Sequence, residues 1–241
     1  MDTQFWPLYG LRITTPRLEL RLPDDELLAE LSAVAADGVH DEASMPFTVP
    51  WTDGTPQDRA RATFQHLLGT IATWRPEKWT LSLAVRHEGK TVGRQDFMTD
   101  DFAVTREGET GSWLGRAHQG QGIGTEMRAA ALHLAFEGLG ARHVTSAAMT
   151  DNPRSLRVSE KLGYRPDGLE VHSVRGEART VRRLRLTRAD WEAKRTVRVE
   201  VTGLEECREL FGIQLPASSL PGQPTHQHRA PEPSPQHLPR P

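Results

Sequence analysis

Three glycines alternate with other residues in the stretch Gly120-Gln-Gly-Ile-Gly124, directly before a helical pattern of apolar residues. Glycine permits the tight turns that bring a backbone close to a ligand. The first N–H groups of a helix have no partners within the helix and lie at its positive end, so they bind anions. A glycine loop at the start of a helix therefore predicts a phosphate or pyrophosphate site.

Two common phosphate-binding loops do not match this stretch. A Walker A loop ends in Gly-Lys-Ser/Thr, whereas Gly124 is followed by Thr125 and Glu126. A dinucleotide loop spaces its second and third glycines three positions apart, whereas Gly122 and Gly124 are two apart. Such a site also needs an acid about 20 residues past the loop, and Asp151 lies too far downstream. For the loop alone, a glycine-rich turn without a ligand stays the alternative.

A second helix start follows a short apolar stretch. Asn152 is a good N-cap, Pro153 suits the first helical position, and Gly163 after Leu162 suits the end of the helix. Taken singly, Asn152 is interpreted as a helix cap with no ligand.

Taken together, these motifs resemble those of the GNAT superfamily of N-acetyltransferases. Residues 119–124 read Gln-x-x-Gly-x-Gly, similar to the family's acyl-CoA pyrophosphate loop, and residues 152–164 read Asn-x-x-Ser-x-x-Val-x-Glu-Lys-Leu-Gly-Tyr, similar to its second motif. Residues 15–21 read Thr-x-Arg-Leu-x-Leu-Arg, which resembles the opening strand of the RimJ/RimL branch. The resemblance covers about residues 11–191.

The resemblance implies an α/β (α+β) fold, with a mixed, mostly antiparallel sheet that is splayed at the acyl-CoA site and flanked by helices. Acetyl-CoA would be the acetyl donor, with its pantetheine arm on backbone groups of Trp113 and Leu114 between strands 109–114 and 143–149. An edge with unpaired N–H and C=O groups suits such an arm. The cofactor-binding residues that the resemblance implies are Trp113, Leu114, Gln119, Gly120, Gln121, Gly122, Ile123, Gly124, Thr125, Asn152 and Ser155.

The implied reaction is the transfer of acetyl from a thioester to a primary amine, either a protein N-terminus, as the RimJ/RimL likeness suggests, or a small-molecule amine. It needs a base, an oxyanion donor and an acid for the thiolate. Glu109 is the candidate base, with a plain surface carboxylate as the alternative, and the Leu114 N–H is the candidate donor. Many family members place a tyrosine acid where this chain has Ser159, and a serine hydroxyl is a poorer acid. A non-catalytic acyl-CoA sensor or interaction module is the alternative function.

The elements that must position these groups follow from hydrophobic periodicity and from turn and cap residues. The predicted strands are Leu11–Leu22, which alternates from Arg17 onward, then Trp79–Arg86, Thr91–Met98, Glu109–Leu114, His143–Met149, Leu169–Arg175, Thr180–Leu186 and Val197–Val201. The predicted helices are Asp24–Asp37, Thr55–Trp74, Thr125–Leu139, Asn152–Leu162, one that begins at Thr187 and holds Trp191, and a short one in Gly203–Phe211. A polar connection is predicted over Asp100–Gly108.

A long loop, Gly38–Thr55, separates the first two predicted helices, and long ordered loops are often functional. In the resemblance this region walls the acceptor side. Phe47 and Trp51, with acidic neighbours, would form a pocket for an amine. The alternative is that both aromatic side chains only anchor the loop to the core. The acidic neighbours are Asp41, Glu42 and Asp53.

Bulk properties limit the location and the partners. The 241 residues carry a formal net charge of −2, with one cysteine, Cys207. We therefore expect a cytoplasmic protein with no nucleic acid or membrane partner, no metal and no internal disulfide, while a homodimer is left open. The predicted divisions are a leader over 1–10, the acetyltransferase domain over 11–195, an extension packed on it over 196–213, and a disordered tail rich in Pro and His over 214–241.

Overall fold

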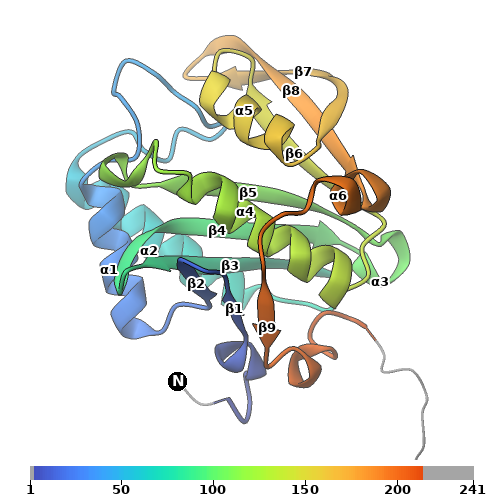
Figure 1. The fold of residues 1–241 in the computed structure, drawn as a ribbon. Coiled ribbons are helices and arrows are strands. Elements are labelled where there is room, and N and C mark those ends of the chain that lie inside the picture. Colours follow the sequence, from blue (N-terminus) through green and yellow to red (C-terminus); the bar gives the residue numbers. More distant parts are fainter. Residues whose placement is uncertain (1–2, 214–241) are drawn as a thin grey trace, which may run out of the picture.

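One nine-stranded sheet organises residues 3–213, the part of the chain that the computed structural model describes (Figure 1). Its strand order is β7-β8-β6-β5-β4-β3-β2-β1-β9. Every neighbouring pair is antiparallel except β5 and β6, which are parallel. The strands are β1 Arg12–Thr14, β2 Leu18–Arg21, β3 Lys78–His87, β4 Lys90–Asp100, β5 Glu107–Leu114, β6 His143–Met149, β7 Arg165–Val174, β8 Glu177–Thr187 and β9 Glu200–Thr202.

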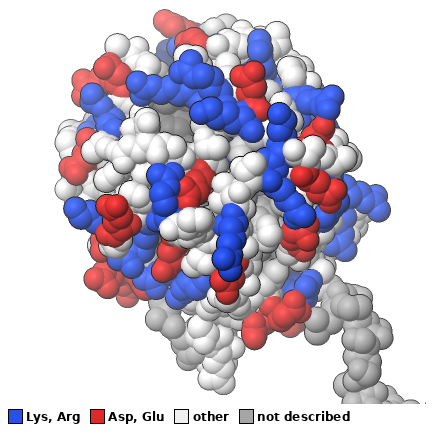
Figure 2. Space-filling view, in the orientation of Figure 1, with Lys and Arg blue, Asp and Glu red and all other residues white. Residues whose placement is uncertain are grey.

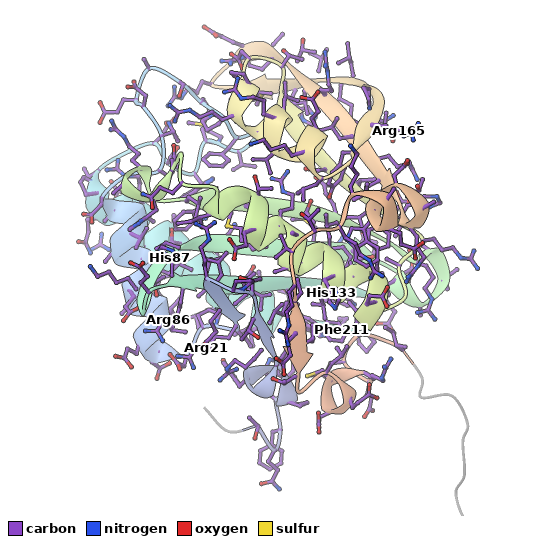
Figure 3. The ribbon with its side chains drawn as sticks, viewed as in Figure 1. Arg21, Arg86, His87, His133, Arg165 and Phe211 are labelled. Carbon is purple, nitrogen blue, oxygen red and sulfur yellow. The ribbon has the colours of Figure 1, made fainter. Side chains whose placement is uncertain are left out.

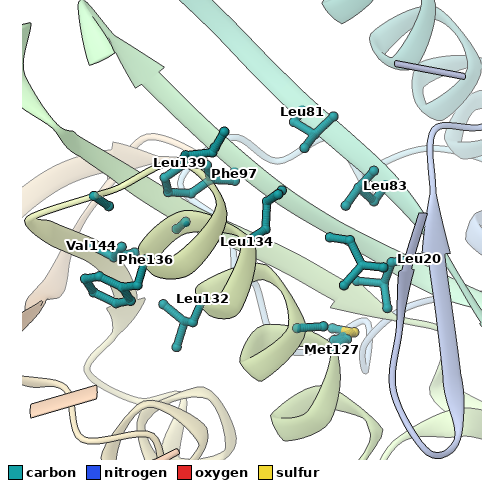
Figure 4. Close-up of a cluster of buried hydrophobic side chains, with 14 of the residues drawn as sticks. Leu20, Leu81, Leu83, Phe97, Met127, Leu132, Leu134, Phe136, Leu139 and Val144 are labelled. Carbon is teal, nitrogen blue, oxygen red and sulfur yellow. The ribbon is translucent and has the colours of Figure 1, made fainter. Parts of the chain in front are cut away.

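Helices cover both faces of the sheet. On one face, α4 lies across the strands, and its Met127 packs with Leu20, Leu83 and other sheet residues in the main core (Figure 4). On the other face, Leu28 and Leu31 of α1 pack against Trp113. The α-helices are α1 Asp25–Ala36, α2 Pro56–Ala72, α3 Phe102–Thr105, α4 Ile123–His133, α5 Pro153–Lys161 and α6 Arg188–Lys194.

Strands β5 and β6 separate part of the way along their length. They pair from Glu107 with His143 as far as Thr110 with Ser146. Beyond that point β5 continues to pair with β4 as far as Leu114, and β6 continues with β8 as far as Met149. The mixed, mostly antiparallel and splayed sheet expected from the sequence is thus confirmed.

Several predicted elements take a different form in the structure. The first predicted strand is a hairpin, because Leu18 donates its N–H to the Thr15 hydroxyl at 2.9 Å and Pro16 has no N–H to give. The predicted helix Thr125–Leu139 begins two residues earlier and closes with a π-turn, in which the Leu139 N–H bonds the Leu134 carbonyl at 2.9 Å. The predicted polar connection contains α3.

The two ends of the described chain pack together. In the predicted leader, Leu8 is fully buried. The Trp6 ring packs edge to face on Trp74, with 6.0 Å between the ring centroids. In the predicted extension, β9 pairs with β1. Phe211, labelled in Figure 3, is fully buried and packs on Trp79, with 4.9 Å between the ring centroids. The predicted tail, 214–241, lies outside the described residues. No helix within residues 3–213 is long and apolar enough to cross a membrane.

Replacing Phe211 by Ala tests whether the extension is part of the core. We expect Phe211→Ala to lower the free energy of unfolding by about 3–5 kcal/mol, because it leaves a cavity among aromatic rings. Phe5→Ala is the matched control, since Phe5 is 78% exposed. Denaturant unfolding of both variants checks this, and equal stability of the two variants would show that the extension contributes nothing to the core.

Candidate functional site

The gap between β5 and β6 presents unpaired backbone groups of β5. The Gly115 N–H bonds the Val92 carbonyl of β4 at 3.0 Å, and backbone groups of successive strand residues point to opposite edges. Trp113 therefore directs its backbone groups to β4, while Ser112 and Leu114 direct theirs into the gap. Of the two residues expected to offer backbone groups there, Leu114 does so. Trp113 does not, because its backbone N–H and C=O groups face β4.

The glycine loop between β5 and α4 holds a row of free N–H groups. Gly120 and Gly122 adopt φ angles of 78° and 79°, in the left-handed region that favours glycine. Within residues 3–213, the N–H groups from Gly120 to Gly124 make no hydrogen bond to the protein, and the Thr125 N–H turns back to the Gly122 carbonyl at 3.1 Å. Such a row at a helix start can bind an anion.

An ion pair holds this loop from the N-terminal hairpin. Arg17 donates from Nε to Glu126 Oε2 at 2.7 Å and from Nη1 to the Gln121 carbonyl at 3.1 Å. The Thr15 hydroxyl donates to Glu126 Oε1 at 2.7 Å. Burial alone would raise the pKa of the Glu126 carboxyl, but the hydrogen bonds and the Arg17 charge outweigh it and lower that pKa. Thr15 and Arg17 belong to the branch motif, but their role beside Glu126 could not be predicted from the sequence, because 109 residues separate Arg17 from Glu126.

The remaining predicted residues of the loop differ in what they offer to a ligand. Gln119 donates to the carbonyls of Val39 and Leu114 and accepts from Arg154 at 3.0 Å, so its side chain joins three segments of the protein. Gln121 donates to the Ala117 carbonyl, and Ile123 is fully buried. Gln121 and Ile123 therefore present their backbone N–H groups to a ligand, whereas the Gln119 N–H bonds the Arg116 carbonyl at 3.3 Å.

Helix α5 forms the other wall of the gap. The Asn152 side chain caps α5 by accepting from the Ser155 N–H at 3.2 Å, and its amide nitrogen has no partner within the described residues. The Ser159 hydroxyl is fully buried. It accepts from Arg128 at 2.9 Å and donates to the Ser155 carbonyl at 3.3 Å. Ser159 is therefore held in place by α4 as well as by its own helix.

Glu109 lies one residue before the point at which β5 and β6 separate, on the opposite face of the sheet from α4. It lines a hollow of about 440 Å³ together with Glu107 and Met98. Glu109 makes no hydrogen bond or ion pair with residues 3–213, and part of its side chain is exposed. Partial desolvation is the larger cause that raises the pKa of Glu109, and the negative charge of Glu170 adds to it. A free carboxylate with a raised pKa beside the gap has the properties of a general base.

The long loop Gly38–Thr55 packs on the face of the sheet that carries Glu109 and α1. Its Phe47 and Trp51 rings are 5.2 Å apart, and Trp51 lies 5.6 Å from Trp113. The loop is therefore anchored by its aromatic residues, next to the strand that carries Glu109. Asp53 pairs with Arg175 of the β7–β8 turn, which ties the loop to the far wall of the site.

Basic side chains gather around α5 and the β7–β8 hairpin, at the top of the view in Figure 2. Arg154 and Arg157 on α5 and Arg182 and Arg183 on β8 are all exposed. An anionic ligand that enters the gap between β5 and α5 would meet this positive field.

Comparison with known proteins matches the chain to one family. The family model of the GNAT acetyltransferase domain matches residues 17–165. RimJ of Mycobacterium smegmatis, solved in complex with CoA-disulfide, is 20% identical over 85% of this chain and 95% of its own, with a TM-score of 0.64. A putative ribosomal-protein-serine acetyltransferase of Vibrio cholerae is 19% identical over 73% of this chain and 97% of its own, with a TM-score of 0.57.

A third structure is a chimera of the spermidine N-acetyltransferase SpeG of Vibrio cholerae with a second protein. It is 17% identical over 73% of this chain and 98% of its own, with a TM-score of 0.58. At these identities the three structures show the likeness of the fold alone.

Removing the charge of Glu126 tests whether its ion pair with Arg17 stabilises the glycine loop. We expect Glu126→Gln to lower the free energy of unfolding at neutral pH by about 1–2 kcal/mol, a value reduced because Arg17 is partly exposed. The folded pKa of Glu126 is lowered, so the pair contributes fully above the ordinary carboxyl pKa and is lost as the pH falls through the folded value. The difference in free energy of unfolding between wild type and Glu126→Gln should therefore become smaller at acid pH.

The control is Glu205→Gln, which removes a pair with Arg208 in which the Glu205 side chain is 66% exposed. Denaturant unfolding at neutral and acid pH gives both comparisons. A Glu126→Gln effect that is no larger than that of the control, or that does not change with pH, would contradict the role given to this pair.

Proposed function

The chain belongs to the GNAT acetyltransferase family, and from this premise we propose that it transfers acetyl from acetyl-CoA to the primary amine of a peptide N-terminus. The observation that carries the proposal is the row of free N–H groups from Gly120 to Gly124, next to a sheet edge that is free at the Ser112 backbone and at the Leu114 N–H. A pyrophosphate fits the row, and an extended amide-containing arm fits the edge.

In the proposed complex, the N–H groups from Gly120 to Gly124 and the Thr125 hydroxyl hold the pyrophosphate, and Asn152 and Ser155 face the arm from α5. The Leu114 N–H points into the gap and donates to the carbonyl oxygen of the thioester, where negative charge develops during the attack. The domain that does this is proposed to span residues 11–195, with 196–213 packed on it. A cytoplasmic location and a homodimer stay predictions.

The amine is proposed to approach from the face that carries Glu109. Glu109 takes the ammonium proton, directly or through one water, which frees the nitrogen lone pair for attack. The new C–N bond forms, the C–S bond breaks with its electron pair on sulfur, and Ser159 is proposed to hydrogen-bond that sulfur. The raised pKa of Glu109 supports this role, because a stronger base removes the proton more readily.

Two observations support an amine on a peptide. The unpaired Glu109 carboxylate lines the 440 Å³ hollow beside the gap and favours a cationic acceptor, whereas Glu107 in the same hollow is paired with Arg185. The hollow lies on an open face of the sheet, where an extended chain could enter. The likeness to RimJ and to the ribosomal-protein-serine acetyltransferase points in the same direction, whereas the spermidine enzyme makes a polyamine the rival acceptor.

The cofactor proposal is tested by calorimetric titration with acetyl-CoA. We expect saturable binding that weakens at least tenfold in Gly122→Glu, about 1.4 kcal/mol, because a carboxylate and a strained φ enter the anion site. The control is Gly69→Glu, on α2, where an added Cβ meets nothing within 4 Å. Absence of binding to wild type would overturn the proposal.

The acceptor is tested by thiol release on addition of peptide N-termini, spermidine and small amines. We expect release with peptides that start with a free amine and none with the same peptides acetylated. Thiol release with spermidine and with no other acceptor would show that the acceptor is a polyamine instead of a peptide. Binding of acetyl-CoA without release across this panel would indicate a sensor instead of an enzyme with one of these acceptors.

Replacing Glu109 by Gln tests the base. We expect kcat/KM to fall roughly 10²-fold, the usual contribution of a general base. In wild type, kcat/KM should fall as the pH drops through the raised pKa of Glu109, because only the carboxylate accepts a proton, and this acid limb should disappear in the variant. Glu107→Gln is the control on the same strand face. Equal losses in both variants would show that acidic charge, not a base, is what matters.

A further inference from the structure

A buried arginine lies beneath the gap, and the proposed reaction does not use it. Arg128, on α4, is 5% exposed. Its Nη1 donates to the Ser159 hydroxyl at 2.9 Å, and its Nη2 donates to the Ser112 hydroxyl at 3.1 Å. Its Nε is buried and has no partner within residues 3–213, and no carboxylate in the same part of the chain pairs with the guanidinium.

Burying a cation without an anion is costly. The loss of hydration is not repaid here, because the two hydroxyl groups supply dipoles but no charge. Burial lowers the pKa of Arg128, but the ordinary arginine value is so high that the group stays protonated at neutral pH. The titratable group that acts on the Arg128 charge is Tyr164, whose pKa burial raises to about 12, so it offers no negative charge at neutral pH. The guanidinium therefore lacks a counterion in the described chain.

The position of Arg128 indicates where a counterion would come from. Ser112 lies on β5 beyond Thr110, the last residue paired with β6, and Ser159 lies on α5 across the gap. The guanidinium thus spans both walls of the gap from below. Another anion site, the free N–H row, lies at the start of the same helix.

We infer that Arg128 is a positioning residue that stabilises the departing thiolate of coenzyme A, through the Ser159 hydroxyl and through its own charge. This inference rests on the proposed function. When the C–S bond breaks, its electron pair stays on sulfur, and the Ser159 O–H turns from the Ser155 carbonyl to the thiolate. Ser159 keeps its proton, because a thiolate is too weak a base to remove a proton from a serine hydroxyl, and the Arg128 charge compensates the negative charge on sulfur. The proton lost by the amine leaves through Glu109.

This role of Arg128 removes a difficulty in the reaction. A serine hydroxyl is a poor acid, so a mechanism that needs it to protonate the thiolate would be slow. A serine that only donates a hydrogen bond, with a cation behind it, needs no such proton transfer. The leaving group departs as an anion that is already paired.

The first measurement is the thiol pKa of coenzyme A bound to the wild-type protein. It is obtained from the ultraviolet absorbance of the thiolate over a pH titration, with the desulfo-CoA complex subtracted. An opposite charge at short range lowers a pKa by roughly 1–3 units, and through one hydroxyl we expect about one unit. The protein adds little signal, because burial raises the pKa of its single cysteine, Cys207, to about 12, and the pKa values of Tyr9 and Tyr164 are raised as well.

Variants then assign the shift. Arg128→Met should return the thiol pKa to that of free coenzyme A, Arg128→Lys should keep part of the shift, and Ser159→Ala should lose part of it. Arg61→Met, at an exposed position on α2, is the matched control and should change nothing. In Arg128→Met, kcat should fall at least tenfold with little change in KM for acetyl-CoA, because the thiolate exists only after bond breaking.

The outcomes separate the two proposals. If coenzyme A does not bind to wild type, the proposed function fails. If it binds and its thiol pKa equals that of the free thiol, the role of Arg128 is overturned while the proposed function stands. That role is also overturned if Arg128→Met lowers thermal stability but leaves the bound thiol pKa at its wild-type value, since Arg128 would then only link α4, α5 and β5.

Discussion

The divergence of β5 and β6 is the constraint on which the rest of the site depends. Each strand keeps one partner, β4 for β5 and β8 for β6, and the two neighbours carry them apart after Thr110 and Ser146. The N–H and C=O groups of Ser112 and the N–H group of Leu114 are left without a partner, while the Leu114 carbonyl accepts from the Gln119 side chain. Unpaired backbone groups at a sheet edge need partners, and an extended ligand arm can supply them. The loop and the helix that follow begin at the end of this same edge.

Helix α4 carries two buried charged residues, Glu126 and Arg128, which differ in their hydrogen-bond partners. Glu126 is surrounded by donors from Thr15 and Arg17, so its charge is satisfied before any ligand arrives. Arg128, two residues later, has only hydroxyl partners and an unpartnered Nε within residues 3–213. The first arrangement fixes the loop geometry, and the second leaves positive charge under the gap. One helix thus carries both the brace of the proposed site and a charge available to an anion.

Local patterns predicted much of the fold, because caps and periodicity act within a few residues. The Thr55–Asp58 capping box, the Asn152 cap and the turn at Gly163 appear where the sequence places them. Non-local features were not predictable in the same way. The backbone orientation of Trp113 depends on the register with β4, the role of Glu126 depends on a hairpin far away in the chain, and Arg128 occupies an apolar-looking helix face. The burial of the leader depends on Trp74, which packs against it from another element.

We propose that the free N–H groups of the glycine loop and of Leu114 hold acetyl-CoA. Residue-resolved amide hydrogen exchange, measured with and without acetyl-CoA, tests this proposal. We expect exchange to slow at Gly120 to Gly124 and at Leu114, while the Trp113 amide, already bonded to β4, changes little. Protection that falls elsewhere on the chain, with these amides unchanged, would contradict it.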